Sequence, residues 1–145
     1  MKIAIASDHA GFRYKEIIKK YLCEKGFEVL DHGTASEESV DYPDFIRPAA
    51  LEVAMNKVDR AIGVCGSGIG VSIVANKVRG VRAALALNEQ MAELSVMHNN
   101  ANFLALSERF IDENCLLKIV DAWLNAKFEG GRHLRRVNKI EQLEN

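Results

Sequence analysis

A cysteine followed by regularly spaced glycines is the most chemically suggestive stretch of this 145-residue chain. Cys65 ends a short apolar run, and Gly66, Gly68 and Gly70 follow it at alternate positions. The apolar run is typical of a buried strand, and the small residues of 71–78 predict a helix, so the glycines form the turn between them. Such a turn points backbone N–H groups and a helix N-terminus at one spot, where negative charge is stabilised.

The thiol of Cys65 is expected at the mouth of this turn. The positive field of a helix N-terminus favours the thiolate, which is the form of cysteine that acts as a base or nucleophile. The alternative is a purely structural role, in which the stretch is a tight turn with a buried cysteine. The glycine spacing matches neither the dinucleotide-binding pattern nor the Walker A loop. Taken alone, the stretch leaves both interpretations open.

Five apolar segments alternate with amphipathic ones and predict the elements that position this turn. Strands are expected at residues 3–6, 27–30, 61–65, 81–87 and 103–106. The alternation predicts an α/β fold in one domain, residues 1–145, with a doubly wound, flavodoxin-like parallel sheet of strand order 2-1-3-4-5. Residues 129–145 are expected to form a helical tail beyond the sheet.

Several residues mark the ends of the expected helices. Asn88 and Asp112 are predicted N-caps, and Asn100 is expected to end a helix because asparagine tolerates the left-handed conformation. Pro48 leaves two possibilities. It lies in the first turn if Asp44 caps its helix, and it interrupts the helix if that helix begins at Pro43.

The predicted topology brings two polar stretches together. Asp8 and His9 end the first strand, and Cys65 ends the third. In the expected strand order these strands are neighbours at the switch point, where doubly wound proteins bind ligands outside the carboxyl ends of the strands. This coincidence favours the functional interpretation of Cys65.

Composition excludes several classes of protein. The 19 basic and 20 acidic residues nearly balance, which argues against a nucleic-acid-binding surface. No apolar run is long enough for a transmembrane helix. Three widely spaced cysteines predict reduced thiols and a cytoplasmic protein, with Cys23 and Cys115 as inert core thiols. The four histidines show no metal-ligand spacing along the chain, so no metal site is expected.

Five short motifs occur in a characteristic order: Ser7-Asp-His-Ala-Gly11, Asp41-Tyr-Pro43, Cys65-Gly-Ser-Gly-Ile-Gly70, His98-Asn99, and Gly130-Gly-Arg-His133 with Arg136. Together they resemble the ribose-5-phosphate isomerase B family, which includes galactose-6-phosphate and allose-6-phosphate isomerases. The resemblance covers essentially the whole chain. It implies an enzyme without metal or cofactor that interconverts a phosphorylated aldose and ketose through an enediolate.

The resemblance also implies roles for particular residues. Cys65 is the base that moves the proton between C1 and C2, and His98 is the acid that opens the sugar ring. The enediolate oxygens are held by the turn residues Gly66, Ser67, Gly68, Ile69 and Gly70, including the Ser67 hydroxyl, which many members replace with threonine. The sugar is lined by Asp8, His9, Tyr42 and Asn99. The phosphate ligands are Arg109, Arg132 and Arg136.

Two alternatives to a pentose-phosphate isomerase remain open on the sequence. One is a 6-phosphohexose isomerase acting on allose or galactose 6-phosphate, because the depth of the pocket is not readable. The other is a flavin- or nucleotide-binding module on the same fold.

An argument from topology predicts the assembly. His98 and Asn99 precede the fifth strand and so lie at the edge where strands begin, whereas Cys65 lies where they end. One strand length, roughly 17–20 Å, separates these edges. A homodimer, or a dimer of dimers, is therefore expected to share its active sites, with the tail arginines entering the partner's site.

Overall fold

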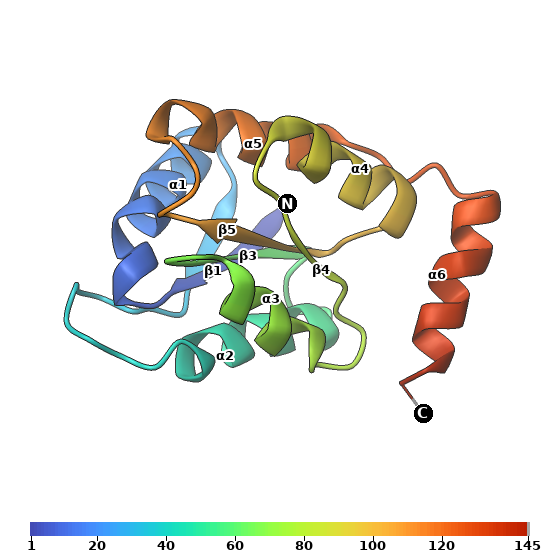
Figure 1. Ribbon diagram of the computed structural model, residues 1–145, viewed down its shortest axis with the longest axis horizontal. Helices are drawn as coiled ribbons and strands as arrows, with labels where there is room; N and C mark the ends of the chain where they lie inside the picture. Colours follow the sequence, from blue (N-terminus) through green and yellow to red (C-terminus); the bar gives the residue numbers. More distant parts are fainter. Residues whose placement is uncertain (145) are drawn as a thin grey trace.

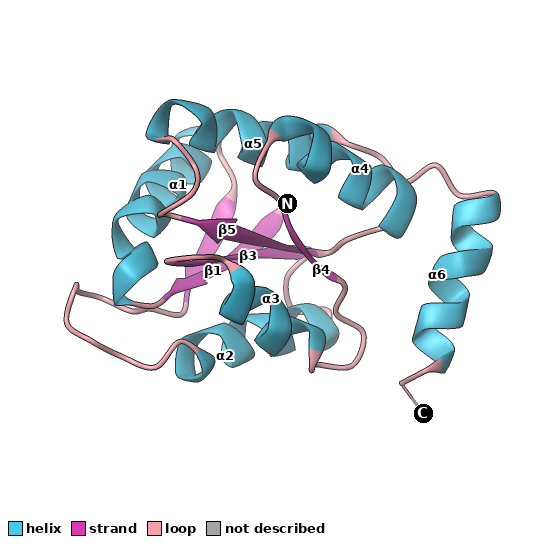
Figure 2. Ribbon diagram, in the orientation of Figure 1, coloured by secondary structure: helices cyan, strands magenta, loops and turns pink. Residues whose placement is uncertain are grey.

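The computed structural model describes residues 1–144 of the chain. Its centre is a sheet of five parallel strands (Figure 2). These strands are β1 (Lys2–Ser7), β2 (Glu28–Asp31), β3 (Arg60–Cys65), β4 (Ala83–Leu85) and β5 (Phe103–Ser107). The expected doubly wound α/β class is therefore confirmed.

Helices cover both faces of the sheet (Figure 1). One face carries α1 (Phe12–Glu24), which follows the short helix η1 (His9–Gly11), together with α4 (Glu89–Asn99) and α5 (Glu113–Asn125). The other face carries α2 (Pro43–Ala54) and α3 (Ile69–Asn76). Successive strand residues point to opposite faces, so Ile3 and Ile5 join the first core while Ala4 and Ala6 join the second.

The expected order of the last two strands was wrong. The order is β2-β1-β3-β5-β4, so β5 lies inside the sheet and β4 forms its edge. All five residues of β5 are buried, whereas β4 has only three residues, each half-buried. A short strand suits an edge, and a fully apolar strand suits the interior. Because β1 still pairs with β3, the switch point lies where the sequence predicted it.

The helix ends agree with most of the expected signals. Asn88 and Asp112 accept hydrogen bonds from Met91 N and Asn114 N, each at 2.8 Å, and Asn100 is left-handed at φ 49°. Pro48 lies inside α2, which begins at Pro43. Pro48 is therefore in the helix interior and not in a first turn capped by Asp44.

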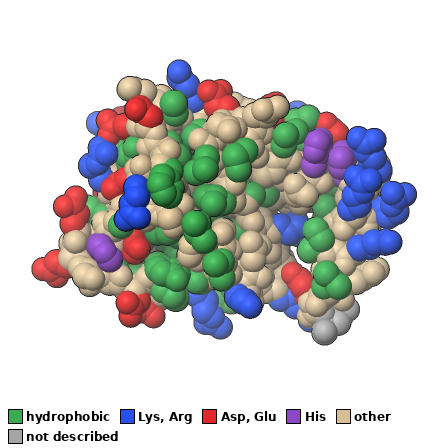
Figure 3. Space-filling view, viewed as in Figure 1, with side chains coloured by type: hydrophobic (Ala, Val, Ile, Leu, Met, Phe, Trp, Pro, Cys, Tyr) green, Lys and Arg blue, Asp and Glu red, His purple; other side chains and the backbone are tan. Residues whose placement is uncertain are grey.

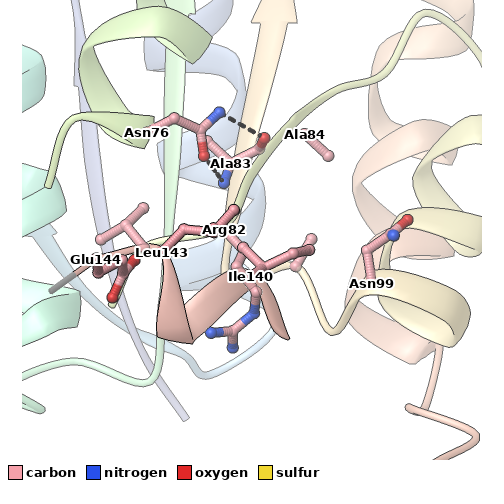
Figure 4. A pocket seen from close by; sticks show the side chains of 10 residues that line it. Asn76, Arg82, Ala83, Ala84, Asn99, Ile140, Leu143 and Glu144 are labelled. Atoms are coloured by element: carbon pink, nitrogen blue, oxygen red, sulfur yellow. Dashed lines mark hydrogen bonds between the residues drawn. The ribbon is translucent and has the colours of Figure 1, made fainter. Parts of the chain in front are cut away.

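The tail forms α6 (Arg132–Gln142), which stands beside α4 and the β4 edge, apart from the two helical layers (Figure 1). Near its far end, Glu141 pairs with Arg82 at 3.1 Å and Glu144 accepts from Gly80 N at 3.0 Å. A cleft of about 440 Å³ separates this helix from the sheet edge (Figure 4).

The structure also bears on the two remaining cysteines and on membrane-spanning helices. Cys23 and Cys115 are exposed, so the expectation that they are core thiols was wrong. Within residues 1–144, no helix combines the length and the apolar character that crossing a membrane requires.

Candidate functional site

A cleft of about 500 Å³ opens at the carboxyl ends of β1 and β3. It is lined by Asp8, His9, Ala10, Tyr42, Cys65, Gly66, Ser67, Ile69, Gly70, Ile73 and Arg109. The structure thus brings together nearly all of the residues expected at this edge of the sheet. Gly68, which was also expected to contact the ligand, lies behind the turn and does not line the cleft.

The glycine turn holds the sulfur of Cys65 as a hydrogen-bond acceptor. The side chain is only 4% exposed, and Sγ accepts from the N–H of Gly68 at 3.1 Å. Gly68 has φ 76°, and a Cβ there would lie 2.6 Å from Leu85 and 3.0 Å from the backbone of Leu106. Glycine is therefore required, and the turn closes tightly enough to aim its amide at the sulfur.

Part of the turn is engaged in its own hydrogen bonds. Ser67 Oγ accepts from Ile69 N at 3.2 Å, as in the turns that serine commonly forms at helix starts. The amides of Gly68 and Ile69 thus serve the turn itself. Gly66, Ser67 and Gly70 line the cleft itself.

The polar end of β1 is fixed by its own neighbours. Asp8 caps η1 by accepting from Gly11 N at 3.0 Å. His9 Nδ1 accepts from the backbone N–H of Val40 at 3.1 Å. The neutral imidazole therefore carries its proton on Nε2, which makes that atom a donor. Tyr42 packs against the turn, because a Cβ on Gly70 would lie 2.7 Å from its ring.

The end of β5 is tied to the glycine turn. Ser107 Oγ donates to Gly66 O at 2.7 Å, and Arg109 N donates to the same oxygen at 2.9 Å. These bonds place the Arg109 side chain in the cleft beside Cys65 of its own chain. The adjacent Glu108 accepts from Tyr14 N at 2.7 Å, and burial raises the pKa of its carboxyl.

The remaining expected residues lie elsewhere. His98 and Asn99 end α4 at the edge where strands begin, and Arg132 and Arg136 are exposed on α6. The pairings of Ala61 with Phe103 and of Cys65 with Ser107 put roughly 13 Å of strand between the two edges. Asn99 instead lines the cleft beside α6, where Figure 4 shows it across from Ile140.

His98 lies next to two other polar side chains at the edge of the sheet where the strands begin. Its ring stacks on that of His133, with centroids 4.2 Å apart and planes 9° apart. Glu129 lies beside both rings, 3.3 Å from His133 Nε2 and 3.9 Å from His98 Nε2. Burial and the neighbouring His98 lower the pKa of His133. The fold brings these side chains together although His98 precedes Glu129 and His133 by 31 and 35 positions along the chain, so the group was not visible as a sequence spacing.

Sequence reasoning missed three contributors to the site. Val40 acts through its backbone, which no side-chain pattern reveals. Ile73 lies one turn beyond Ile69 on α3, and this spacing of two apolar residues on one helix face was a usable signal. Glu108 is half-buried beside the cleft residue Arg109 and accepts a hydrogen bond from Tyr14 N of α1, a contact between segments far apart in the sequence.

The fold and the cleft define a doubly wound α/β protein with a buried thiol and an anion-stabilising turn at its switch point. A model of the family described as "Ribose/Galactose Isomerase" matches residues 3–140. The chain belongs to this family.

Individual relatives match over nearly the full length. Ribose-5-phosphate isomerase B of Escherichia coli is 46% identical over 143 residues, which cover 99% of this chain and 96% of that protein. The structure of ribose-5-phosphate isomerase B from Clostridium thermocellum superposes with a TM-score of 0.98 at 51% identity, covering 99% of this chain and 97% of that one. The Mycoplasma genitalium enzyme, solved with bound ribulose 5-phosphate, gives a TM-score of 0.95 at 48% identity and covers 99% and 95%.

Proposed function

We propose that this protein is an aldose–ketose isomerase that interconverts ribose 5-phosphate and ribulose 5-phosphate through an enediolate. Relatives that match over the whole chain carry the name ribose-5-phosphate isomerase B. The observation that carries the proposal is the buried Cys65 Sγ, held as an acceptor 3.1 Å from Gly68 N in a cleft that also contains Arg109. A base, an anion-stabilising turn and a cationic side chain thus share one cleft.

In the proposed chemistry, the Cys65 thiolate removes the proton from C2 of the aldose and returns it to C1, while the hydroxyl proton on O2 is transferred to O1. A proton next to a carbonyl is too weakly acidic to remove unless the enediolate is stabilised as it forms. The amides of Gly66, Ser67 and Gly70 and the Ser67 hydroxyl supply that stabilisation. The glycine turn supplies the role that a metal ion has in other isomerases, so the proposed mechanism needs neither metal nor cofactor.

The rest of the substrate is held by side chains around the same cleft. Asp8, His9 and Tyr42 contact the sugar hydroxyls, with His9 acting as a donor through Nε2. Arg109 binds the phosphate from the same chain as Cys65, since guanidinium groups can bind two phosphate oxygens at once.

The ring-opening acid comes from a second copy of the chain in this proposal. His98 and Asn99 lie at the opposite edge of the sheet from Cys65, so they reach only a partner's cleft. Large apolar side chains are exposed on α3, which borders the cleft, and around α4, as expected for a surface that a partner covers. They include Ile69 and Ile73 on α3 and Leu87, Met91 and Leu94 on or near α4. Figure 3 shows hydrophobic side chains gathered across the middle of this face.

The tail would complete the partner's site. α6 stands beside the body with Leu134 and Ile140 exposed, and basic side chains gather along it (Figure 3). Arg132 and Arg136 on this helix would bind the phosphate held by the other subunit. The assembly is then a homodimer, or a dimer of dimers, with shared sites.

A comparison of substrates tests the proposal. With enzyme in chelator-treated buffer, we expect kcat/KM for ribose 5-phosphate to exceed the values for allose 6-phosphate and galactose 6-phosphate. A preference for either hexose phosphate would move the assignment to that branch of the family. Failure to turn over any of the three, with a flavin copurifying, would favour the binding-module alternative instead.

A further inference from the structure

His98, Glu129 and His133 form a group of metal-binding side chains that we call the histidine–glutamate cluster. One ligand atom from each residue lies within 4.8 Å of the others. His98 comes from the end of α4, His133 from the first turn of α6, and Glu129 from the link between α5 and α6. The proposed reaction uses His98 alone of the three, so the convergence of the other two needs a separate explanation.

The backbone around the cluster is tied down. Glu129 N donates to Met97 O at 3.1 Å, which fixes the link beside the end of α4. His133 N donates to Gly130 O at 3.0 Å, and the His133 side chain is nearly buried. The three side chains are therefore brought together by the fold.

The distances suit a small tetrahedral ion. Metal–ligand bonds of about 2.1 Å place neighbouring ligand atoms of a tetrahedral site roughly 3.4 Å apart. Glu129 is already 3.3 Å from His133 Nε2, and its 3.9 Å separation from His98 Nε2 is only slightly longer. The rings lie nearly parallel, so one must tilt for both nitrogens to face one ion. His98, whose side chain is 39% exposed, has the freedom to do so.

The ligand set identifies the class of metal. Imidazole nitrogens with one carboxylate suit zinc and its neighbours among the transition metals, whereas calcium and magnesium prefer oxygen ligands. Two histidines and one glutamate, with the fourth position open to water, are a known zinc-binding set. The nearby Arg132 and Arg136 oppose a cation, which makes a permanently occupied structural site less suited to this cluster than a reversible one.

We propose that the histidine–glutamate cluster binds Zn²⁺ and that binding reversibly inhibits the enzyme. The inhibition rests on the proposed function, because a zinc-bound His98 has no Nε2 proton to give to the ring oxygen of the sugar. Zinc in this role is a regulator and not a cofactor, so the chelator-treated enzyme is the fully active form.

Binding is tested on the untagged enzyme without substrate, by calorimetric titration with ZnCl₂. We expect about one Zn²⁺ per chain, with affinity lowered roughly tenfold or more in Glu129→Gln and in His133→Asn. Glu24→Gln, the same change at an exposed position on α1, should bind as the wild type does. Cys65→Ala should also bind normally, which separates the cluster from the thiol. Unchanged affinity in both cluster variants, or loss of binding in Cys65→Ala, would overturn the site.

Co²⁺ gives a spectroscopic check that does not depend on activity. Tetrahedral Co²⁺ at the cluster should show strong visible absorption without the sulfur-to-metal charge-transfer band that a thiolate ligand produces. Such a band in the wild type would overturn the assignment.

Inhibition is then measured as turnover of ribose 5-phosphate against Zn²⁺ concentration. The concentration that halves the rate should rise roughly tenfold or more in Glu129→Gln, whose activity without zinc is expected to match the wild type. Zinc bound at the cluster without loss of turnover would overturn the inhibition and would also count against His98 as the acid. Absence of zinc binding would overturn the site and leave the isomerase proposal unaffected.

Discussion

Cys65 is the side chain on which the proposed chemistry depends most directly. It was identifiable from the sequence because a strand, a glycine turn and a helix leave few other conformations for the residue at the junction. Its hydrogen bond from Gly68 was not identifiable, because it depends on the left-handed conformation of Gly68. The pattern thus predicted where the thiol lies, and the structure shows which amide fixes it.

Replacement of Cys65 tests its role as the base. We expect Cys65→Ala to lower kcat by at least about a hundredfold, as loss of a general base typically does, while KM changes little. Exchange of the C2 proton with deuterated solvent, followed by NMR, should stop as well. Cys23→Ala is the matched control, because it makes the same change at an exposed cysteine of α1, outside the cleft, and should leave kcat and proton exchange at their wild-type values. Proton exchange at the wild-type rate in Cys65→Ala would remove this residue from the mechanism.

Other residue-scale features follow from tertiary packing alone. His133 and Glu129 lie in a segment that the sequence described only as a glycine-rich break and a basic tail. They meet His98 because α5 ends at Asn125 and the next residues run extended back to α4. No spacing along the chain encodes that contact, which is why the cluster was missed.

At the scale of elements, the positions of strands and helices followed from apolar periodicity and from capping residues. The order of β4 and β5 within the sheet could not be predicted in this way, because both segments are apolar runs in the sequence. The difference between them lies in length and burial. Arg82 at the start of the expected fourth strand was a usable signal, since a charged side chain suits an edge better than a sheet interior.

A buried ion pair connects α1 to β2. Lys15 is fully buried, and its Nζ lies 2.9 Å from both carboxylate oxygens of Asp31. Lys19 and the backbone of Gly33 also donate to Asp31. Burial alone would raise the pKa of this carboxyl, but the hydrogen bonds from Lys19, Lys15 and Gly33 outweigh it and hold the pKa below its usual value.

We expect Asp31→Asn to lower the free energy of unfolding by about 3 kcal/mol at neutral pH, because it removes the charged partner that Lys15 contacts through two oxygens. The carboxylate of Glu16, 3.0 Å from Lys15 Nζ, is then the remaining anionic partner of this buried cation. Chemical denaturation measures this. Glu28→Gln is the control on the same strand, where the pair with Lys2 is exposed, and it should cost less than about 1 kcal/mol. Equal costs for the two variants would contradict a structural role for the buried pair.

The pH dependence of this difference follows from the lowered pKa. A carboxyl whose pKa is depressed by folding adds stability above its unfolded pKa of about 3.9, and that stability is lost as pH falls through the folded value. The gap between wild type and Asp31→Asn should therefore be full at pH 6 to 8 and should narrow below about pH 4. A gap that is constant down to acidic pH would show that the carboxylate charge is not responsible.

At the scale of the whole molecule, the residues of the proposed active site lie in two separate places on one chain. The cleft contains Cys65 and Arg109, whereas His98, Arg132 and Arg136 lie at the edge where strands begin or on α6. The sequence predicted this division because strand direction in a parallel sheet fixes which edge each connection reaches. It could not predict where α6 would lie, since no strand follows that helix.

Complementation between two inactive variants tests the shared site. In the proposed dimer, each site takes Cys65 from one subunit and His98 from the other. Cys65→Ala and His98→Asn homodimers therefore each have two damaged sites. A mixed dimer has one site with both residues intact and one site with neither. Equal mixing with free exchange makes half of the dimers mixed, so activity should return to about a quarter of the wild-type value. Formation of the mixed species can be followed by native mass spectrometry with one variant isotopically labelled.

The matched control mixes Cys65→Ala with Arg109→Ala, which the structure places in the same cleft of the same chain. That pair leaves no intact site in any mixed dimer, because each subunit's cleft lacks one residue, so its activity should stay low. If mixed dimers form and the first pair regains no more activity than the second, the two edges do not serve one substrate and the shared site is wrong.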